Sequence, residues 1–192
     1  MKVLEDKIRA YGRTLNEDVL LVDMFLNHQV DCELMREIGS EFARLFSKES
    51  IDRVVTIEAS GIAPALMTAL ELRVPLVVLK KSASVINQGA LQTEVFSFTK
   101  QKSYLLTLKS EYLPAGERVL LIDDFLANGE AALGAARLIE EAGGIVAGIG
   151  IVISKNYMPG LQRLRDAGYK VSSLAQIGAM SEGFVRFVGE ED

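Results

Sequence analysis

The stretch from Val119 to Ala132, VLLIDDFLANGEAA, constrains the fold of this chain more than any other. A run of apolar residues leads into two aspartates, a loop of small residues follows, and an alanine-rich segment continues the chain. This order predicts a buried strand, a loop and a helix, the unit from which parallel α/β sheets are built. Ligands of such sheets bind beyond the carboxyl ends of the strands, where the next helix offers unpaired N–H groups. The stretch therefore predicts an anion-binding loop.

Strand and helix patterns alternate along the rest of the chain. We expect strands at 54–57, 76–79, 145–153, 171–174 and 184–188, a hairpin of 95–98 and 104–108 joined by 99–102, and an extended segment at 19–26. We expect helices at 2–11, from the capping residue Asp31 onward, from about Pro64, at 129–142 and at 159–167. Gly12 is expected as a left-handed helix end. The pattern predicts an α/β fold of one domain, 1–192, with a mostly parallel sheet and helices on both faces.

The adjacent carboxyl groups of Asp123 and Asp124 allow two interpretations. At the end of a strand they could accept hydrogen bonds from the vicinal hydroxyls of a sugar phosphate, or bind a hydrated divalent cation. Alternatively, Asp124 could cap the following helix while Asp123 is solvated. The residues alone do not decide between them.

Charge and cysteine content exclude several classes of protein. The formal net charge of -5 argues against a surface that coats nucleic acid, which needs clustered cations. The longest apolar run, 145–153, is too short to span a membrane, and Met1 leads into a charged amphipathic pattern rather than a signal segment. The single Cys32 cannot form an intrachain disulfide and is expected to have a packing role. We therefore expect a cytoplasmic protein.

The apolar run, the aspartate pair and the small-residue loop resemble the phosphoribosyl diphosphate (PRPP) motif of type I phosphoribosyltransferases. The whole chain is similar to the bacterial xanthine branch of that family. The resemblance implies that the phosphoribosyl group of PRPP is transferred to N9 of xanthine, which gives xanthosine monophosphate and pyrophosphate. It also implies Mg²⁺ bound with PRPP, a homodimer, and a small hood over the site formed by about 1–35 and the C-terminal region.

The resemblance assigns roles to three groups of residues. Those expected to bind xanthine are Leu20, Asn27 and Lys155. Those expected to bind PRPP are Asp123, Asp124, Ala127, Asn128, Gly129, Glu130 and Ala131, with Glu58, Ala59, Ser60 and Gly61 as the pyrophosphate loop. From the residues alone, Asn27 could equally be a turn residue and Lys155 a solvated cation. Tyr157 could stack on a planar base, and no direct metal ligand is assigned to the protein.

The segment from Ser82 to Leu91 has no hydrophobic period and is rich in small residues. By resemblance it is the flexible loop that closes over the site, although a disordered surface insertion would have the same sequence pattern. The nearby cations are Lys80, Lys81, Lys100 and Lys102, one of which could reach the pyrophosphate.

The phosphate loop departs from the pattern outside the xanthine branch. Other members carry threonine, glycine and a second threonine or serine where this chain has Asn128, Gly129 and Ala131, so hydroxyl contacts to the phosphate are lost. Two alternative functions stay open. One is transfer to adenine, guanine or hypoxanthine. The other is a regulatory module that senses PRPP or a purine without turnover, although the sequence has no evident helix-turn-helix or basic patch.

Overall fold

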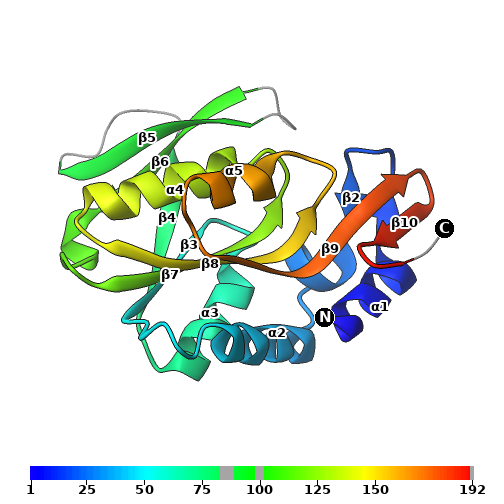
Figure 1. Ribbon diagram of the computed structural model, residues 1–192, viewed down its shortest axis with the longest axis horizontal. Coiled ribbons are helices and arrows are strands. Elements are labelled where there is room, and N and C mark those ends of the chain that lie inside the picture. The colour runs from blue at the N-terminus through cyan, green and yellow to red at the C-terminus, as the bar shows by residue number, and fades with distance from the viewer. Residues whose placement is uncertain (83–88, 98–101, 191–192) are drawn as a thin grey trace.

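A computed structural model describes residues 1–82, 89–97 and 102–190 of the protein (Figure 1). The helices are α1 (Lys2–Tyr11), α2 (Cys32–Leu45), α3 (Ile62–Leu72), α4 (Glu130–Glu141) and α5 (Gly160–Asp166), with a π-helical turn at Asp23–Asn27 and a 3₁₀ turn at Ser110–Tyr112. The strands are β1 (Arg13–Thr14), β2 (Leu20–Leu21), β3 (Arg53–Ile57), β4 (Leu76–Ser82), β5 (Ala90–Ser97), β6 (Lys102–Lys109), β7 (Arg118–Leu126), β8 (Ile145–Lys155), β9 (Val171–Ser181) and β10 (Phe184–Phe187). The expected alternation of strands and helices is confirmed.

The main sheet has the strand order β10-β9-β8-β7-β3-β4-β6-β5 in the described part of the chain. Its five central strands, β9, β8, β7, β3 and β4, are parallel. The strands added at the two edges, β10 on one side and the β5–β6 hairpin on the other, are antiparallel. The predicted fold class, a mostly parallel sheet flanked by helices, is therefore confirmed.

Helices cover both faces of this sheet, as Figure 1 shows, with α2 and α3 on one side and α4 and α5 on the other. The apolar stripe of α2 faces one core, where Leu34, Ile38 and Phe42 are almost fully buried. As predicted, the Asp31 carboxylate caps this helix by accepting a hydrogen bond from Leu34 N at 3.1 Å. The face of α4 that carries Ala132, Ala135 and Leu138 packs into the second core.

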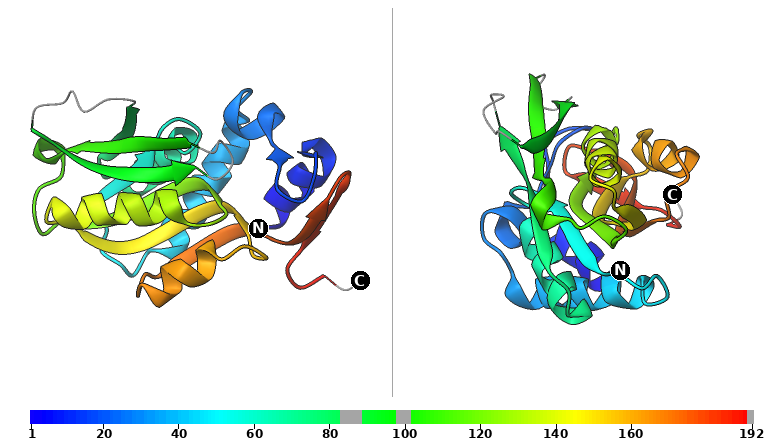
Figure 2. Two further views of the ribbon diagram at one scale, coloured as in Figure 1. Left: turned by 90° about the horizontal axis from the view of Figure 1, so that it is seen from above. Right: turned by 90° about the vertical axis from the view of Figure 1, so that its left-hand side faces the viewer.

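The β5–β6 hairpin packs against α4, and the left view of Figure 2 shows the two lying side by side. A glycine makes the close approach possible. A Cβ atom at Gly134 of α4 would lie only 2.6 Å from Cγ2 of Val95 in β5. This packing brings the hairpin to the same end of the sheet as the loop between β7 and α4.

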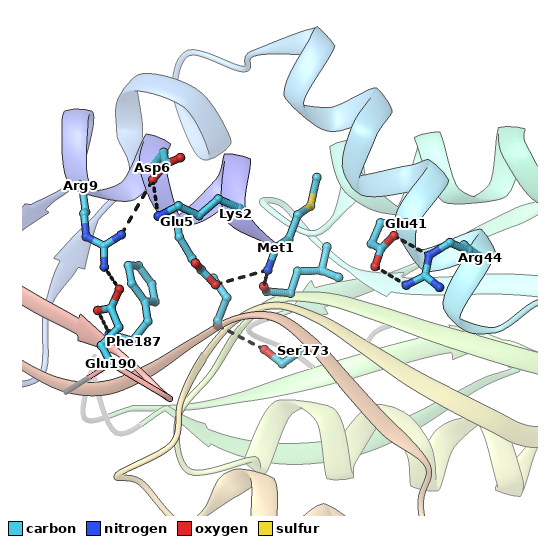
Figure 3. Close-up of polar contacts among 12 residues, drawn as sticks. Met1, Lys2, Glu5, Asp6, Arg9, Glu41, Arg44, Ser173, Phe187 and Glu190 are labelled. Carbon is cyan, nitrogen blue, oxygen red and sulfur yellow. Dashed lines mark hydrogen bonds and ion pairs between the residues drawn. The ribbon is translucent and has the colours of Figure 1, made fainter.

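The two ends of the chain meet beside β9, where α1, β2 and β10 gather at one end of the sheet (Figure 1). Figure 3 shows Arg9 of α1 between the carboxylate of Glu190, to which it donates a hydrogen bond, and the ring of Phe187. The guanidinium lies 4.7 Å from the ring centroid, within cation–π range. Gly183 N also donates to Thr14 O at 3.2 Å. These contacts tie the N-terminal segment to the C-terminal hairpin.

Several local expectations are wrong. Gly12 is extended, with φ of -72°, because the chain continues into β1 instead of turning back. Only Leu20–Leu21 of the segment 19–26 is a strand, and Asp23–Asn27 forms the π-helical turn. Cys32 is exposed on the first turn of α2 and does not serve the core.

The segment expected as a loop at 82–91 is partly strand, since β4 includes Ser82 and β5 begins at Ala90. Residues 83–88 of that segment, and residues 98–101 within the expected hairpin connection, lie outside the described part of the chain. No helix in the described part of the chain has both the length and the apolar character needed to cross a membrane.

Candidate active site

A cleft of about 540 Å³ opens at the carboxyl ends of β7 and β8. The walls come from the end of β7, the loop and first turn that lead into α4, the end of β8, the N-terminal segment and the β5–β6 hairpin. Their lining residues are Asp18, Val19, Leu20, Leu21, Asn27, Val95, Phe96, Tyr104, Asp124, Phe125, Leu126, Ala127, Asn128, Gly129, Glu130, Ala131, Ala132 and Lys155. The three residues expected to bind the base thus share one cavity with Asp124 and the whole expected phosphate loop.

The loop from Ala127 to Glu130 has its shape imposed by glycine. Gly129 adopts a left-handed conformation, with φ of 87°, and immediately precedes α4. This conformation is strained for residues with a Cβ atom, so glycine is the fitting residue. Gly129 has no side chain that could cap α4, and the first residues of the helix line the cleft with their N–H groups uncapped by a side chain. That arrangement suits a bound phosphate.

The first residues of α5 contact this loop and fix its position. Gly160 N donates to Ala127 O at 2.9 Å. A Cβ atom at Gly160 would lie 2.3 Å from that same oxygen, so the two segments touch backbone to backbone. Arg163, one turn later, donates from Nη1 to Asn128 O and to Glu130 Oε1, both at 2.6 Å. The pairing neutralises a carboxylate that would otherwise repel an anion in the cleft.

The aspartate pair lies within β7 rather than at its end, because the strand continues to Leu126. Asp123 is buried, with 5% of its surface exposed, and Asp124 lines the cleft. Burial, together with the neighbouring Asp124 carboxylate, raises the pKa of Asp123 well above its usual value. The helix α4 begins six positions after Asp124, so the alternative in which Asp124 caps it is wrong.

The expected pyrophosphate loop, Glu58 to Gly61, lies beside the cleft but does not line it. The peptide bond between Glu58 and Ala59 is cis. The Glu58 carboxylate accepts from Lys81 N at 2.6 Å and pairs with Lys80 Nζ at 3.1 Å. Burial raises the pKa of Glu58, but the contacts to the two lysines outweigh it and lower the pKa overall.

The loop nevertheless reaches the aspartate pair. A Cβ atom at Gly61 would lie 3.5 Å from Asp123 Oδ1. On the other side, the Lys81 ammonium lies 5.2 Å from the centroid of the Tyr104 ring, which lines the cleft. Two of the candidate cations, Lys80 and Lys81, are therefore beside the cleft, while Lys100 lies outside the described residues.

Lys155 is almost fully buried, with 8% of its surface exposed, at the end of β8. Its ammonium donates to Asp18 O and lies 5.9 Å from the centroid of the Phe125 ring. Burial lowers the pKa of Lys155 below its ordinary value. Because Asp18 O accepts from only one of the three N–H donors, the ammonium still has donors for a ligand in the cleft.

Tyr157 follows two residues later and is largely exposed, with its surface 41% accessible. It does not line the cleft, and its hydroxyl donates to Glu17 O at 2.6 Å. Partial burial of the hydroxyl, together with the Asp18 and Glu17 carboxylates, raises the pKa of Tyr157. Stacking of this ring on a base remains a prediction.

Nine lining residues were not predicted as site residues, namely Asp18, Val19, Leu21, Val95, Phe96, Tyr104, Phe125, Leu126 and Ala132. Phe125 carried a usable signal, since it directly follows the aspartate pair. Val95, Phe96 and Tyr104 belong to a hairpin that was predicted, but its packing over α4 was not. The role of Arg163 could not be predicted from its sequence neighbours, because its hydrogen-bond partners lie more than thirty positions away.

Known proteins resemble this chain over nearly its whole length. The family model for the phosphoribosyl transferase domain matches residues 15–177. A protein of Clostridium botulinum (strain Hall) named xanthine phosphoribosyltransferase 1 is 53% identical over 189 residues, which are 98% of this chain and 100% of that protein. A xanthine phosphoribosyltransferase of Exiguobacterium sp. is 52% identical over 98% of both chains.

Solved structures resemble the fold as well. The crystal structure of an adenine phosphoribosyltransferase from Thermoanaerobacter pseudethanolicus superposes with a TM-score of 0.74 over 90% of this chain and 99% of that one. The two sequences are only 22% identical, so this likeness concerns the fold alone.

Proposed function

This chain belongs to the phosphoribosyl transferase family, and from that premise we propose that it is a purine salvage enzyme that acts on xanthine. It transfers the phosphoribosyl group of PRPP to N9 of xanthine and releases pyrophosphate, which gives xanthosine 5'-monophosphate. The observation that supports this proposal most strongly is that two features share one cleft. They are the loop before α4, whose conformation depends on Gly129, and the buried ammonium of Lys155. The first fits a phosphate and the second fits an oxopurine.

The phosphate loop and the aspartate pair bind PRPP in this proposal. The 5'-phosphate sits on the N–H groups of the Ala127–Ala131 segment, where the dipole of α4 favours negative charge. Asp124, which faces the cleft, accepts hydrogen bonds from the ribose hydroxyls. The loop Glu58–Gly61 and the nearby Lys81 receive the pyrophosphate, and holding the reactants in place supplies much of the catalysis.

A magnesium ion enters with PRPP. Among residues 1–82, 89–97 and 102–190, the structure contains no group of three or more carboxylate, histidine or cysteine side chains that could hold a metal. Mg²⁺ keeps several waters and binds through substrate phosphates and one or two carboxylates, and Asp124 offers such a carboxylate in the cleft. Asp124, which lines the cleft, is the residue that would hold it, because Asp123 is buried and its pKa is raised. When bound, the ion neutralises the charge of the leaving pyrophosphate.

The other half of the cleft reads the base. Lys155 donates to the oxygen at position 6 of an oxopurine, whereas the amino group of adenine would place donor against donor. Asn27 donates its amide hydrogen to the oxygen at position 2, which hypoxanthine lacks and guanine replaces with an amino group. Leu20 covers the apolar face of the ring.

The direct test is pyrophosphate release from PRPP and Mg²⁺ in the presence of xanthine, guanine, hypoxanthine or adenine. Xanthine should give the highest kcat/KM, with xanthosine monophosphate as the product by mass spectrometry. Higher activity with another base would reassign the substrate. Tight PRPP binding without release on any base would instead favour a sensor of PRPP or purines.

We further propose a cytoplasmic homodimer with the hood, about 1–35 and the C-terminal region, closing over the base. The two most exposed leucines of α3, Leu66 and Leu70, are 51% and 70% accessible and lie one helical turn apart. They offer an apolar face for a second copy of the chain. Sedimentation should give a dimer at micromolar concentration, and a wild-type protein that stays monomeric would count against it.

A further inference from the structure

Two carbonyl groups that follow one another in the N-terminal segment accept hydrogen bonds from the end of β8. Glu17 O accepts from the Tyr157 hydroxyl at 2.6 Å, and Asp18 O accepts from the Lys155 ammonium. The donors are only two residues apart, although more than 130 residues separate them from their acceptors. The loop is therefore held at two adjacent points, by Lys155 at the end of β8 and by Tyr157 in the turn that follows it.

The loop of residues 15–19, called here the N-terminal loop, satisfies three of its own N–H groups internally. The side-chain oxygen of Asn16 accepts from Asp18 N and from Val19 N, both at 2.8 Å. Leu15 N donates to Val19 O at 2.9 Å and closes the turn. Such an Asx turn fixes the conformation of the loop. Its outward carbonyls at Glu17 and Asp18 are thereby left for β8.

The position of the N-terminal loop determines the position of the adjacent residues 19–21, which form the wall of the cleft proposed to contact the base. Val19, Leu20 and Leu21 follow the two anchored carbonyls directly and line the cleft. The chain here has little other regular structure, since β1 and β2 are two residues long each. Loss of one anchor would therefore loosen the wall that Leu20 contributes.

We propose that Tyr157 is a positioning residue, whose hydroxyl holds the N-terminal loop so that Leu20 and the ammonium of Lys155 keep their places at the base. This inference rests on the proposed function and deepens it. It gives Tyr157 a role other than stacking, which agrees with its place outside the cleft. Lys155 bridges the loop and the base, and the Tyr157 hydroxyl keeps Asp18 O beside that ammonium.

The decisive variant is Tyr157→Phe, which keeps the ring and removes only the hydroxyl. The KM for xanthine should rise about tenfold, as expected for one well-placed hydrogen bond, while the KM for PRPP stays within about twofold. Without any ligand, amide hydrogen exchange at residues 17–21 should become faster. The matched control is Tyr169→Phe, which removes a hydroxyl bonded at 3.0 Å to Glu140 on α4, away from the cleft.

A second pair of variants approaches the same loop from its other side. Asn16→Ala removes the acceptor of the Asx turn and should raise the KM for xanthine as Tyr157→Phe does. Asn16→Asp keeps that acceptor and should restore the wild-type value. Neither side chain lines the cleft, so a direct contact with the base does not explain the result.

Two results would overturn the inference. One is unchanged hydrogen exchange at residues 17–21 in Tyr157→Phe. The other is a wild-type KM in Tyr157→Phe combined with a raised KM in Tyr157→Leu, which would indicate stacking by the ring. If the wild-type protein released no pyrophosphate with any base, the proposed function would fail, and the exchange experiment would still test the hydroxyl contact by itself.

Discussion

The proposed phosphate side of the cleft, Ala127–Ala131, and its proposed base side, with Leu20, Asn27 and Lys155, are built by different means. On the phosphate side, the loop before α4 lies backbone against backbone on α5, with Gly129 and Gly160 at the contact. On the base side, Leu20 and Asn27 belong to a segment of two-residue strands and one π-helical turn. Single side chains, Lys155 at the end of β8 and Tyr157 in the turn after it, hold that segment in place.

The difference indicates how each side tolerates change. A backbone contact between a strand-helix loop and a neighbouring helix has little freedom to adapt, so it presents the same N–H groups to PRPP whichever base is bound. A segment held by side-chain hydrogen bonds can shift when one bond changes. We therefore expect phosphate-side variants to affect turnover with every base, and base-side variants to change the choice among bases.

On the phosphate side, the largest effect is expected for Gly160→Ala. Its new Cβ atom would lie 2.3 Å from Ala127 O, so the phosphate loop must move. Because a displacement of about 1 Å can cost about 100-fold in rate, kcat/KM for PRPP should fall by about that factor with all bases. Steady-state kinetics on Gly178→Ala, where the nearest atom to the added Cβ is 3.6 Å away, provides the control. Equal activity of Gly160→Ala and Gly178→Ala would contradict the claim that backbone contact with α5 fixes the phosphate loop.

A smaller effect on the same side is expected for Arg163→Ala. It removes the hydrogen bonds to Asn128 O and Glu130 Oε1, and leaves the Glu130 carboxylate unneutralised at the cleft. The KM for PRPP should rise about tenfold, with the order of preference among bases unchanged. Arg165→Ala, an exposed arginine of the same helix, should match the wild type. A changed base preference in Arg163→Ala would show that the two sides are coupled.

On the base side, Asn27→Ala should narrow the preference for xanthine over hypoxanthine. Asn27 is exposed at the end of its π-helical turn, so the change in the ratio of kcat/KM values should be about tenfold or less. The adjacent His28, which does not line the cleft, gives a matched His28→Ala control. If Asn27→Ala slows both bases by the same factor, the amide does not read position 2.

The most modest effect concerns stability and pH at Asp123. Burial raises the pKa of this carboxyl group, so the folded state holds its proton to higher pH than the unfolded chain. The stability that the neutral form contributes is complete below the unfolded pKa and is lost as pH rises through the folded one. Asp123→Asn should therefore unfold at higher temperature than the wild type at pH 8, with the difference closing toward pH 4. A difference that widens toward pH 4 would contradict this assignment.

The sequence predicted best where local pattern and tertiary structure agree. Apolar runs gave the central strands, and Asp31 and Gly129 marked helix starts because capping and left-handed backbone are local requirements. The stretch containing the aspartate pair likewise predicted the strand, loop and helix that form one wall of the cleft. Even there, the end of β7 was misplaced, since Phe125 and Leu126 continue the strand past two carboxylates.

The sequence predicted worst where distant contacts decide the conformation. Residues 13–27 have no strong period, and their path depends on carbonyl contacts to Lys155 and Tyr157. Gly12 is extended because the next residues pair with β2, which no helix-end rule anticipates. The position of Tyr104 in the cleft likewise depends on how the hairpin packs over α4, a tertiary choice.

Calorimetric titration of PRPP with Mg²⁺ into Lys155→Ala, alongside Asp124→Ala, tests most directly whether the cleft has a phosphate side and a separate base side. We predict that Lys155→Ala binds PRPP within about twofold of the wild type, although its kcat/KM for xanthine falls by about 100-fold or more. Asp124→Ala should lose most of its PRPP affinity. An equal loss of PRPP affinity in the two variants, with both proteins folded, would contradict the account.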